Sequence, residues 1–232
     1  MRLNQFISSS GFCSRRRADL FIKEQKVTVN GQIIKLGHVI NEGDRVEVDG
    51  QLILAKENDI YIMLNKPPGV TCTTASHIEA NIIDFVNYPE QIFPVGRLDK
   101  QSEGIILRTD DGSIVNALLR EENNQEKDYI VTVDKKINEG FIESMSAGVD
   151  IYNPRKKQNT MTKRCKVVQI DDYSFKITLS QGLNRQIRRM CRRFQYTVTK
   201  LQRVRIKNIS LGQLEVGCWR YLSDEEVKGL KE

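Results

Sequence analysis

The stretch Gly96-Arg97-Leu98-Asp99, followed by Ser102-Glu103-Gly104, sets an arginine and a carboxylate two residues apart just before the apolar run Ile105-Ile106-Leu107. The apolar run predicts a buried strand, so Arg97 and Asp99 are expected in the loop that leads into it. Taken alone, Asp99 is better explained as a turn or cap residue than as a catalytic one, because aspartate is common in both. Its interpretation therefore depends on the rest of the chain.

The positive charge of the chain is concentrated in two segments. The net charge is +6, and residues 181–210 hold nine basic side chains and no acidic one. The first 30 residues hold six basic and two acidic side chains. Such clustering is typical of a protein that binds a polyanion, most simply a nucleic acid. A solubilising surface is the competing interpretation, and the absence of acids over 30 residues argues against it.

Composition also excludes several classes of protein. With 232 residues and 39% hydrophobic side chains, the chain can bury one large domain or a small and a medium one. No apolar run approaches the roughly 20 residues that span a bilayer, and no secretory signal is recognisable, so we expect a cytoplasmic protein. The five cysteines and two histidines lack metal-ligand spacing, and phosphate-binding glycine motifs are missing. We therefore expect no metal and no cofactor.

The first 50 residues read as a separate small domain. Ser14 is expected to cap a helix that runs to about Gln25. Residues 15–17, all arginine, then occupy its first turn, where the helix dipole disfavours cations and a phosphate partner would compensate. Asn30-Gly31 predicts a type I′ hairpin turn. These features, with Arg2-Leu3-Asn4, resemble the S4 domain, a small RNA-binding module, which implies that the arginine-rich helix faces RNA.

Residues 51–59 are polar and are expected to form a linker, so that a second domain covers residues 60–232. In that domain, predicted strands and helices alternate without a clean βαβ repeat. We therefore expect an α+β fold with a mixed, mostly antiparallel sheet flanked by helices. Helices are predicted around residues 112–120, 138–147 and 184–195.

The helix predicted over residues 184–195 carries an apolar stripe and an excess of arginine. Asn184 is its expected N-cap. Several arginine pairs lie one turn apart, and each like-charge pair costs on the order of 0.2–0.5 kcal/mol. A helix with such repulsion is expected to meet anions, either RNA phosphates or a carboxylate in a cleft. Its apolar stripe consists of Ile187, Met190, Cys191 and Phe194.

Four ordered motifs of the second domain resemble those of pseudouridine synthases, in the branch that modifies ribosomal RNA and carries an S4 domain. The segment Asn81-Ile82-Ile83-Asp84-Phe85-Val86-Asn87 and the last motif are nearest to the F-type large-subunit enzymes. The motifs are Asn65-Lys66-Pro67-Pro68-Gly69, Gly96-Arg97-Leu98-Asp99 with Ser102-Glu103-Gly104, Lys127-Asp128-Tyr129, and Gly182-Leu183-Asn184-Arg185-Gln186-Ile187-Arg188-Arg189-Met190.

The resemblance implies that uridine in RNA is isomerised to pseudouridine after the nucleotide is flipped out of its helix. It assigns Asp99 as the attacking carboxylate and leaves open whether the ribose or the base is attacked. Arg188 would pair with Asp99, and Tyr129 would stack on the flipped base. Arg97 would hold the vacated RNA position, while Lys66 would support the pocket loop and contact RNA. The isomerisation needs no metal or redox cofactor.

The expected partner is large-subunit ribosomal RNA or its assembly intermediate, with tRNA as an alternative. The protein is expected to be a monomer and not to bind membranes. The residues expected to bind RNA are Arg15, Arg16, Arg17, Lys66, Arg97, Arg185, Arg189 and Arg192.

Two other functions compete with this prediction. A non-catalytic RNA-binding or ribosome-assembly protein could retain the fold, although the intact Asp99, Tyr129 and Arg188 argue against it. A metal-dependent nuclease could use Asp110-Asp111 or Asp171-Asp172, but both pairs read better as turns. A basic segment at residues 153–158 is explained equally well as a solvated loop and as an RNA contact.

Overall fold

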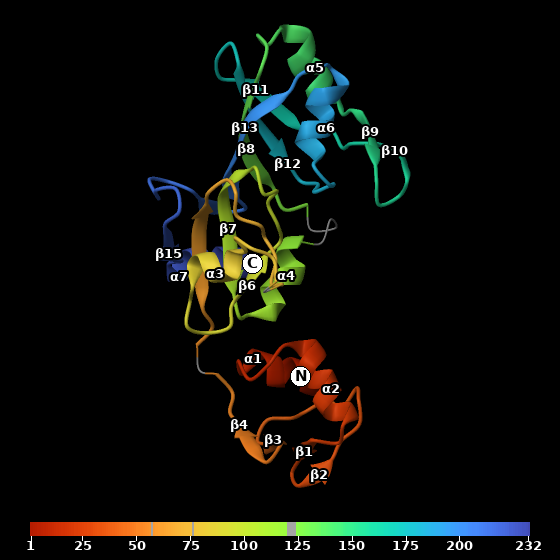
Figure 1. The fold of residues 1–232 in the computed structure, drawn as a ribbon, viewed down its shortest axis with the longest axis vertical. Coiled ribbons are helices and arrows are strands. Elements are labelled where there is room, and N and C mark those ends of the chain that lie inside the picture. Colours follow the sequence, from red (N-terminus) through yellow and green to blue (C-terminus); the bar gives the residue numbers. More distant parts are fainter. Residues whose placement is uncertain (57, 76, 120–123) are drawn as a thin grey trace. The chain divides into compact units, whose positions relative to one another are not determined.

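In the computed structural model, residues 1–56, 58–75, 77–119 and 124–232 are described (Figure 1). They form two compact units. The first consists of Met1–Ile60 with Tyr88–Ile92 and Thr109–Gly112, and the second holds Tyr61–Asn87, Phe93–Arg108 and Ser113–Glu232. Among the described residues, no helix has the length and apolar character needed to cross a membrane.

The first unit packs two helices against a small antiparallel sheet. Its buried side chains come from both helices and from three strands, including Ile7, Ala18 and Val46. Asn30 and Gly31 have φ values of 52° and 79°, as a type I′ turn requires. The strand β4 begins at residue 51, inside the predicted linker 51–59. The elements are α1 (Leu3–Ser9), α2 (Arg15–Lys23), β1 (Val27–Val29), β2 (Gln32–Ile33), β3 (Val46–Val48) and β4 (Gln51–Ile53), with strand order β2-β1-β3-β4.

Helix α2 begins where the sequence predicts. The Ser14 hydroxyl accepts a hydrogen bond from the Arg17 backbone N–H at 3.3 Å. The helix ends at Lys23, slightly before the predicted end, because Gln25 adopts a left-handed φ of 58° that cannot continue a right-handed helix. Residues 15–17 are exposed in the first turn, with no acidic side chain beside them in that turn.

The second unit is built on a nine-stranded mixed sheet with the path β11-β12-β8-β13-β7-β5-β15. The strands β13 and β7 run parallel, whereas the β11-β12-β8-β13 and β5-β15 pairings are antiparallel. The predicted α+β class is confirmed. The strands are β5 (Tyr61–Lys66), β6 (Phe93–Val95), β7 (Glu103–Thr109), β8 (Lys127–Val133), β11 (Lys166–Gln169), β12 (Ser174–Leu179), β13 (Val198–Ile206), β14 (Ile209–Ser210) and β15 (Trp219–Tyr221).

Two hydrophobic cores support this sheet. One packs α5 and α6 on β8, β12 and β13, through residues such as Phe141 and Met190 (Figure 1). The other packs α4 and α7 near β7, through residues such as Ile105, Leu118 and Leu230. Residue 120 of the predicted helix 112–120 lies outside the described residues. The remaining elements are α3 (Ile82–Val86), α4 (Gly112–Leu119), α5 (Glu139–Ala147), α6 (Gln186–Arg193), α7 (Asp224–Lys231) and the hairpin of β9 (Asp150–Asn153) and β10 (Gln158–Met161).

The N-cap predicted for α6 is wrong by one residue. Arg185, with φ 50°, occupies the N-cap position and makes no capping hydrogen bond. The backbone and side-chain oxygens of Asn184 instead accept hydrogen bonds from the Arg189 guanidinium. The predicted apolar stripe is confirmed, since Ile187, Met190 and Cys191 are buried and Phe194 packs against the same core. The helix therefore turns its arginines away from the core.

Candidate active site

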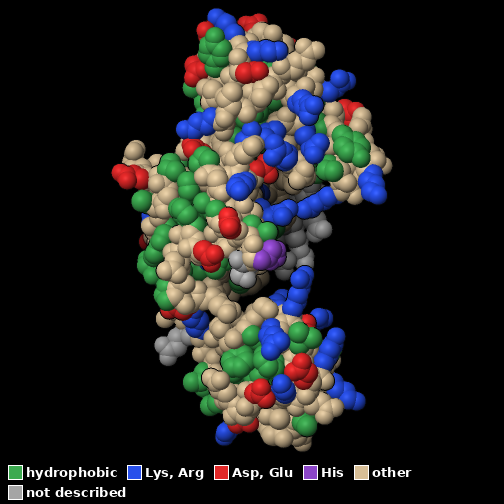
Figure 2. Space-filling view, in the orientation of Figure 1, with side chains coloured by type: hydrophobic (Ala, Val, Ile, Leu, Met, Phe, Trp, Pro, Cys, Tyr) green, Lys and Arg blue, Asp and Glu red, His purple; other side chains and the backbone are tan. Residues whose placement is uncertain are grey.

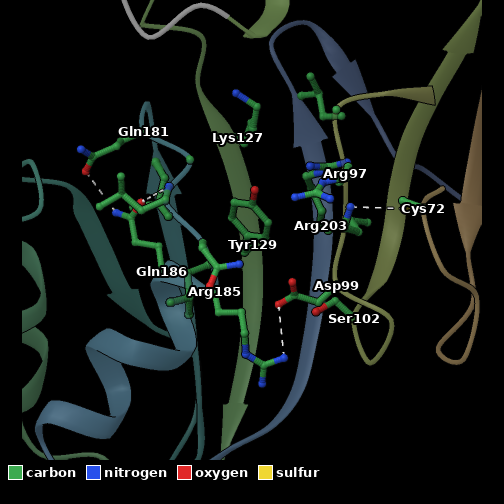
Figure 3. A pocket seen from close by; sticks show the side chains of 18 of the residues that line it. Cys72, Arg97, Asp99, Ser102, Lys127, Tyr129, Gln181, Arg185, Gln186 and Arg203 are labelled. Carbon is green, nitrogen blue, oxygen red and sulfur yellow. Dashed lines mark hydrogen bonds and ion pairs between the residues drawn. The ribbon is translucent and has the colours of Figure 1, made fainter. Parts of the chain in front are cut away.

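A cavity of about 650 Å³ opens in the second unit, between the loop after β6, the strands β8 and β13, and the start of α6 (Figure 3). Asp99 is the one carboxylate among the lining residues that the structure describes. Blue side chains gather beside the hollow of this unit in Figure 2. The cavity is thus strongly cationic around a single acid. The cationic lining residues are Arg97, Lys100, Lys127, Arg155, Arg185, Arg188 and Arg203.

Asp99 lies between two arginines at equal distance. Its Oδ2 atom is 4.0 Å from Arg185 Nη1 and 4.0 Å from Arg188 Nε. The Arg185 side chain is 44% exposed and the Arg188 side chain is 13% exposed, while that of Asp99 is 32% exposed. The carboxylate therefore faces solvent on one side and a buried cation on the other.

The loop that carries Asp99 is fixed by short-range contacts. Gly96 takes φ 77°, Leu98 is buried, and the Leu98 N–H donates to Cys72 Sγ at 3.4 Å. The Ser102 N–H closes a turn onto the Asp99 carbonyl at 3.0 Å. With Leu98 anchored inside, Arg97 and Asp99 both line the cavity, as Figure 3 shows. The predicted loop is confirmed.

Lys66 is buried completely and holds the neighbouring loop from inside. Its ammonium group donates to the carbonyls of Pro67 at 2.7 Å, Val70 at 3.0 Å and Lys100 at 3.5 Å. Burial lowers the pKa of Lys66 below its usual range, against the opposing charges of Cys72 and Asp99. This geometry gives Lys66 a loop-supporting position in place of the predicted RNA contact, because its amine does not reach solvent.

The two terminal nitrogens of the Arg188 guanidinium donate hydrogen bonds to neighbouring residues. Its Nη1 donates to the Val198 carbonyl at 3.0 Å, and its Nη2 donates to Ser102 Oγ at 3.4 Å. Its Nε is buried and faces Asp99 without a hydrogen bond. Burial and the charge of Arg185 lower the pKa of Arg188, and Asp99 opposes that shift. The arginine thus joins α6 and β13 to the Asp99 loop.

Strand β8 presents Lys127 and Tyr129 to the cavity from alternate positions. Tyr129 pairs in register with Arg203 on β13 and with Ile177 on β12. The Lys127 ammonium donates to the Gln125 carbonyl at 3.1 Å. Burial, reinforced by the charge of Arg203, lowers the pKa of Lys127 to about 8.

Arg203 was not predicted, yet it is the most deeply buried cation of the cavity at 3% exposure. Its Nε donates to the Ile105 carbonyl at 2.8 Å, and its buried Nη2 has no hydrogen-bond partner among the described residues. The signal was present in the sequence, since the alternation of β13 places Arg203 on the same face as the buried Leu201.

Gly104 lets strand β7 approach the backbone of Arg203. It has φ 107°, and a Cβ atom at this position would lie 2.2 Å from the Arg203 carbonyl oxygen. Such a distance is far inside van der Waals contact, so only glycine fits here without a backbone shift. The glycine of Ser102-Glu103-Gly104 therefore fixes the distance between β7 and β13.

The structure brings Asp99, Tyr129, Arg97, Arg185 and Arg188 to one cavity. The other predicted RNA-binding residues lie elsewhere. Arg189 is bound to Asn184, and Arg192 is exposed farther along α6, outside the cavity. Arg15, Arg16 and Arg17 belong to the first unit. In the basic segment 153–158, the turn between β9 and β10, Arg155 lines the cavity.

Three of the four aspartates considered for a nuclease form hydrogen bonds or ion pairs within the protein. Asp110 accepts a hydrogen bond from the Ile60 N–H at 2.7 Å and pairs with Lys56. Asp171 accepts one from the Tyr173 N–H at 2.8 Å, and Asp172 pairs with Lys136 at 3.0 Å. Within the described part of the chain, no three His, Cys, Asp or Glu side chains are grouped to hold a metal ion. These aspartates act as turn and ion-pair residues.

Comparison with known proteins agrees with this geometry. The chain is 50% identical over 229 residues to the dual-specificity RNA pseudouridine synthase RluF of Escherichia coli (strain K12), covering 98% of this chain and 77% of that protein. It is 31% identical over 237 residues to the ribosomal large subunit pseudouridine synthase B of Bacillus subtilis (strain 168), covering 99% and 95%. A crystal structure of a pseudouridylate synthase superposes with a TM-score of 0.70 at 30% identity, covering 99% of both chains.

Two family models match successive parts of the chain. The S4 domain model matches residues 1–46, and the RNA pseudouridylate synthase model matches residues 60–193. The second match alone covers more than half of the 232 residues. The chain therefore belongs to the RNA pseudouridylate synthase family and is an RNA pseudouridine synthase with an N-terminal S4 domain.

Proposed function

We propose that Asp99 is the carboxylate that this pseudouridine synthase uses to attack the target nucleotide. The observation that carries the proposal is the isolation of Asp99, a single carboxylate among seven cationic side chains in the described lining of the cavity. A nucleophilic carboxylate must be held in a fixed orientation, and Arg185 and Arg188 each lie 4.0 Å from Asp99 Oδ2, where they can hold it. Because RNA is a polyanion, the same cations also draw the substrate to the acid.

The reaction exchanges one bond of the nucleotide for another. The bond between uracil N1 and ribose C1′ breaks, a bond between C5 and C1′ forms, the C5 hydrogen leaves as a proton, and N1 gains a proton. No electrons are lost, so the chemistry is an isomerisation. Attack by Asp99 on the ribose and attack on the base ring both lead to this balance. Either route requires the uridine to leave its stacked position at a cost of a few kcal/mol.

The other cavity residues receive roles from their positions. Arg188, held by Val198 and Ser102, keeps Asp99 oriented from the buried side. Tyr129 supplies an aromatic face on which a flipped uracil stacks, a contact worth about 1–3 kcal/mol per base. Arg97 is exposed at the cavity beside Asp99 and holds the RNA position that the nucleotide vacates.

We assign phosphate contacts to arginines of α2, of α6 and of the residue that precedes α6. Residues 15–17 on α2 face solvent in the first turn, where a phosphate would offset their unfavourable position on the helix dipole. Arg185, Arg189 and Arg192 provide a second basic surface on α6. Binding at both is expected to weaken with salt, because each phosphate contact releases counterions.

We further propose large-subunit ribosomal RNA, as free RNA or in an assembly intermediate, as the substrate. The Bacillus subtilis relative is named as a large-subunit enzyme, and the Escherichia coli relative is named as having dual specificity. A tRNA is the second substrate class to compare. A monomer working in the cytoplasm, with its catalytic domain beginning at residue 60, completes the proposal.

Tritium release from RNA labelled at uracil C5 tests the assignment. Wild-type protein is expected to release tritium from large-subunit RNA, and Asp99→Asn is expected to lose about a thousandfold or more while RNA binding stays within threefold. Asp171→Asn, which changes an aspartate engaged in a local turn, is the control and should keep full activity. Full activity of Asp99→Asn would refute the catalytic assignment.

A further inference from the structure

Strand β13 carries two arginines, Arg203 and Arg205, whose side chains lie in different surroundings although they are only two residues apart. Arg203 lines the cavity, whereas Arg205 does not and instead reaches Asp128. In a regular strand, residues two apart face the same side of the sheet. The pairing between β13 and β8 shifts between these two arginines, so that Arg203 is opposite Tyr129 and Arg205 is opposite Asp128. A β-bulge at residue 204 therefore separates the two side chains.

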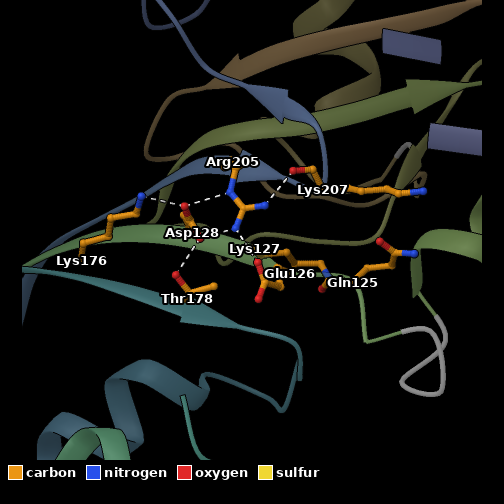
Figure 4. Close-up of polar contacts among 8 residues, drawn as sticks. All are labelled: Gln125, Glu126, Lys127, Asp128, Lys176, Thr178, Arg205 and Lys207. Atoms are coloured by element: carbon orange, nitrogen blue, oxygen red, sulfur yellow. Dashed lines mark hydrogen bonds and ion pairs between the residues drawn. The ribbon is translucent and has the colours of Figure 1, made fainter. Parts of the chain in front are cut away.

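Next to the bulge, Arg205 and Asp128 form a bidentate ion pair whose carboxylate is buried (Figure 4). Arg205 Nε donates to Asp128 Oδ2 at 2.9 Å, and Arg205 Nη2 donates to Asp128 Oδ1 at 2.8 Å. The Asp128 side chain is 5% exposed and also accepts from Thr178 Oγ1 at 2.9 Å and pairs with Lys176 Nζ at 2.8 Å. Three adjacent strands, β12, β8 and β13, are thus joined through one carboxylate.

The charges around this pair favour its ionised state. Burial alone would raise the pKa of Asp128, but the hydrogen bonds from Arg205, Lys176 and Thr178 outweigh burial and hold it well below its usual range. The remaining Arg205 donors go to the Lys207 carbonyl at 2.7 Å and to the exposed Glu126 carboxylate at 2.9 Å. Bidentate pairing adds geometric specificity to the attraction, so it fixes where Arg205 lies along β8.

We propose that the Asp128–Arg205 ion pair positions the catalytic cavity, because it holds the bulge that keeps Arg205 off the face on which Arg203 lies opposite Tyr129. Without the bulge, Arg205 would be opposite Lys127, on the same face as Arg203, and Asp128 would lose its bidentate partner. The pair thus selects the register that puts one arginine in the cavity and one outside it. Asp128 and Arg205 are positioning residues, since neither lines the cavity.

The placement of Arg203 is constrained from its other side as well. Gly104 of β7 packs against the Arg203 backbone so closely that a Cβ atom would meet its carbonyl oxygen at 2.2 Å. The Arg203 guanidinium is bound at Nε to Ile105, while its Nη2 has no partner among the described residues. The glycine on β7 and the ion pair with β8 therefore constrain the Arg203 backbone from both sides, and its side chain lines the cavity.

The test compares three variants by tritium release, and it rests on the proposed function for its activity readout. Asp128→Asn and Arg205→Lys both remove the bidentate ion pair between Asp128 and Arg205, and kcat is expected to fall at least tenfold in each. Glu126→Gln is the matched control, because it removes the exposed partner of the same arginine and leaves Asp128 in place. It should keep kcat within twofold. Equal activity of all three variants and the wild type would overturn the proposal.

A double-mutant cycle separates positioning from general stability. In an Arg203→Gln background, Asp128→Asn should lower kcat by less than twofold further, because the group that it positions is already gone. A loss as large as in the wild-type background would show that Asp128 does not act through Arg203 and would also overturn the proposal. If Asp128→Asn does not unfold cooperatively, Arg205→Lys carries the same cycle.

The register itself can be measured without activity. Backbone NMR contacts between residues 128 and 205 should be present in the wild type and lost or shifted in Arg205→Lys, with the contacts of β12 to β8 retained. A wild-type protein that keeps the register but releases no tritium would contradict the proposed function alone. A variant that retains the wild-type register would contradict the positioning role alone.

Discussion

Arg185 and Arg188 provide a matched test of the role proposed for Asp99. Both approach the same carboxylate oxygen, Oδ2, at 4.0 Å. They differ in burial, since the Arg185 side chain is 44% exposed and that of Arg188 is 13% exposed. Distance alone predicts equal effects of replacing them, whereas solvent screening predicts very unequal ones. We expect the buried arginine to control the chemical step.

The expected magnitudes follow from the dielectric environment. At 4 Å, two unit charges attract by about 1 kcal/mol in water and about 4 kcal/mol at an effective dielectric constant of about 20, the value that describes charge pairs in proteins. Exposed ion pairs are worth about 0–1 kcal/mol in measured cycles. Arg188→Gln should therefore lower kcat by about 100-fold to 1,000-fold, at about 1.4 kcal/mol for each tenfold. Arg185→Gln should lower kcat by less than about fivefold and act mainly on KM.

Steady-state tritium release at saturating RNA separates the two effects, with the thermal unfolding midpoint as a check on folding. Arg188→Lys serves as a further control, because it retains the charge but cannot reach both Val198 and Ser102 in the arginine's manner. Its kcat should lie between those of Arg188→Gln and the wild type. Equal losses of kcat in Arg185→Gln and Arg188→Gln would refute the reasoning from burial.

Three further outcomes are expected. Burial, aided by the charge of Arg203, lowers the pKa of Lys127 to about 8, so kcat/KM for RNA should fall as the pH rises through about 8 and the lysine loses its charge. Lys127→Arg should move this decline to higher pH. An unmoved decline would show that the decline is not due to Lys127. Gly104→Ala should lower the free energy of unfolding in urea by about 3 kcal/mol, because the added Cβ atom strains the backbone and overlaps Arg203. Gly140→Ala in α5 should raise the free energy of unfolding by about 0.5–1 kcal/mol. Similar effects of the two substitutions would contradict the packing argument. Replacing residues 15–17 with glutamine should weaken RNA binding and reduce the salt slope by about 2, and an unchanged slope would exclude them as phosphate contacts.

The parts of the site that depend on local pattern could be predicted from the sequence. The loop with Asp99 precedes an apolar strand, and α6 shows a helical stripe, so both were located correctly. Helix α2 was found from its cap for the same reason. Each of these signals lies within about ten neighbouring residues, where periodicity and turn chemistry act directly.

The parts that depend on tertiary contacts could not be predicted. Lys66 is consistent with either an RNA contact or a buried support, and the choice is made by carbonyls that include Lys100, 34 positions away. The role of Arg185 as N-cap depends on a left-handed φ that a non-glycine residue seldom adopts. Arg205 follows Arg203 by two residues yet faces away from the cavity, and this depends on a bulge that exists only because β13 pairs with β8.

Under the proposed role of Asp99, the crowding of cations around it resolves a conflict inherent in the reaction. A carboxylate that attacks a nucleotide in RNA must approach a chain of phosphates that repels it, and an uncompensated anion at the cavity would oppose binding. Arg188 on the buried side neutralises the carboxylate at a fixed orientation, while Arg185 on the exposed side shields it where phosphates arrive. The repulsion among these arginines is a cost in the free protein that bound phosphates offset. We therefore propose that two arginines at one distance from one oxygen serve different steps, because Arg185 is more screened by solvent than Arg188.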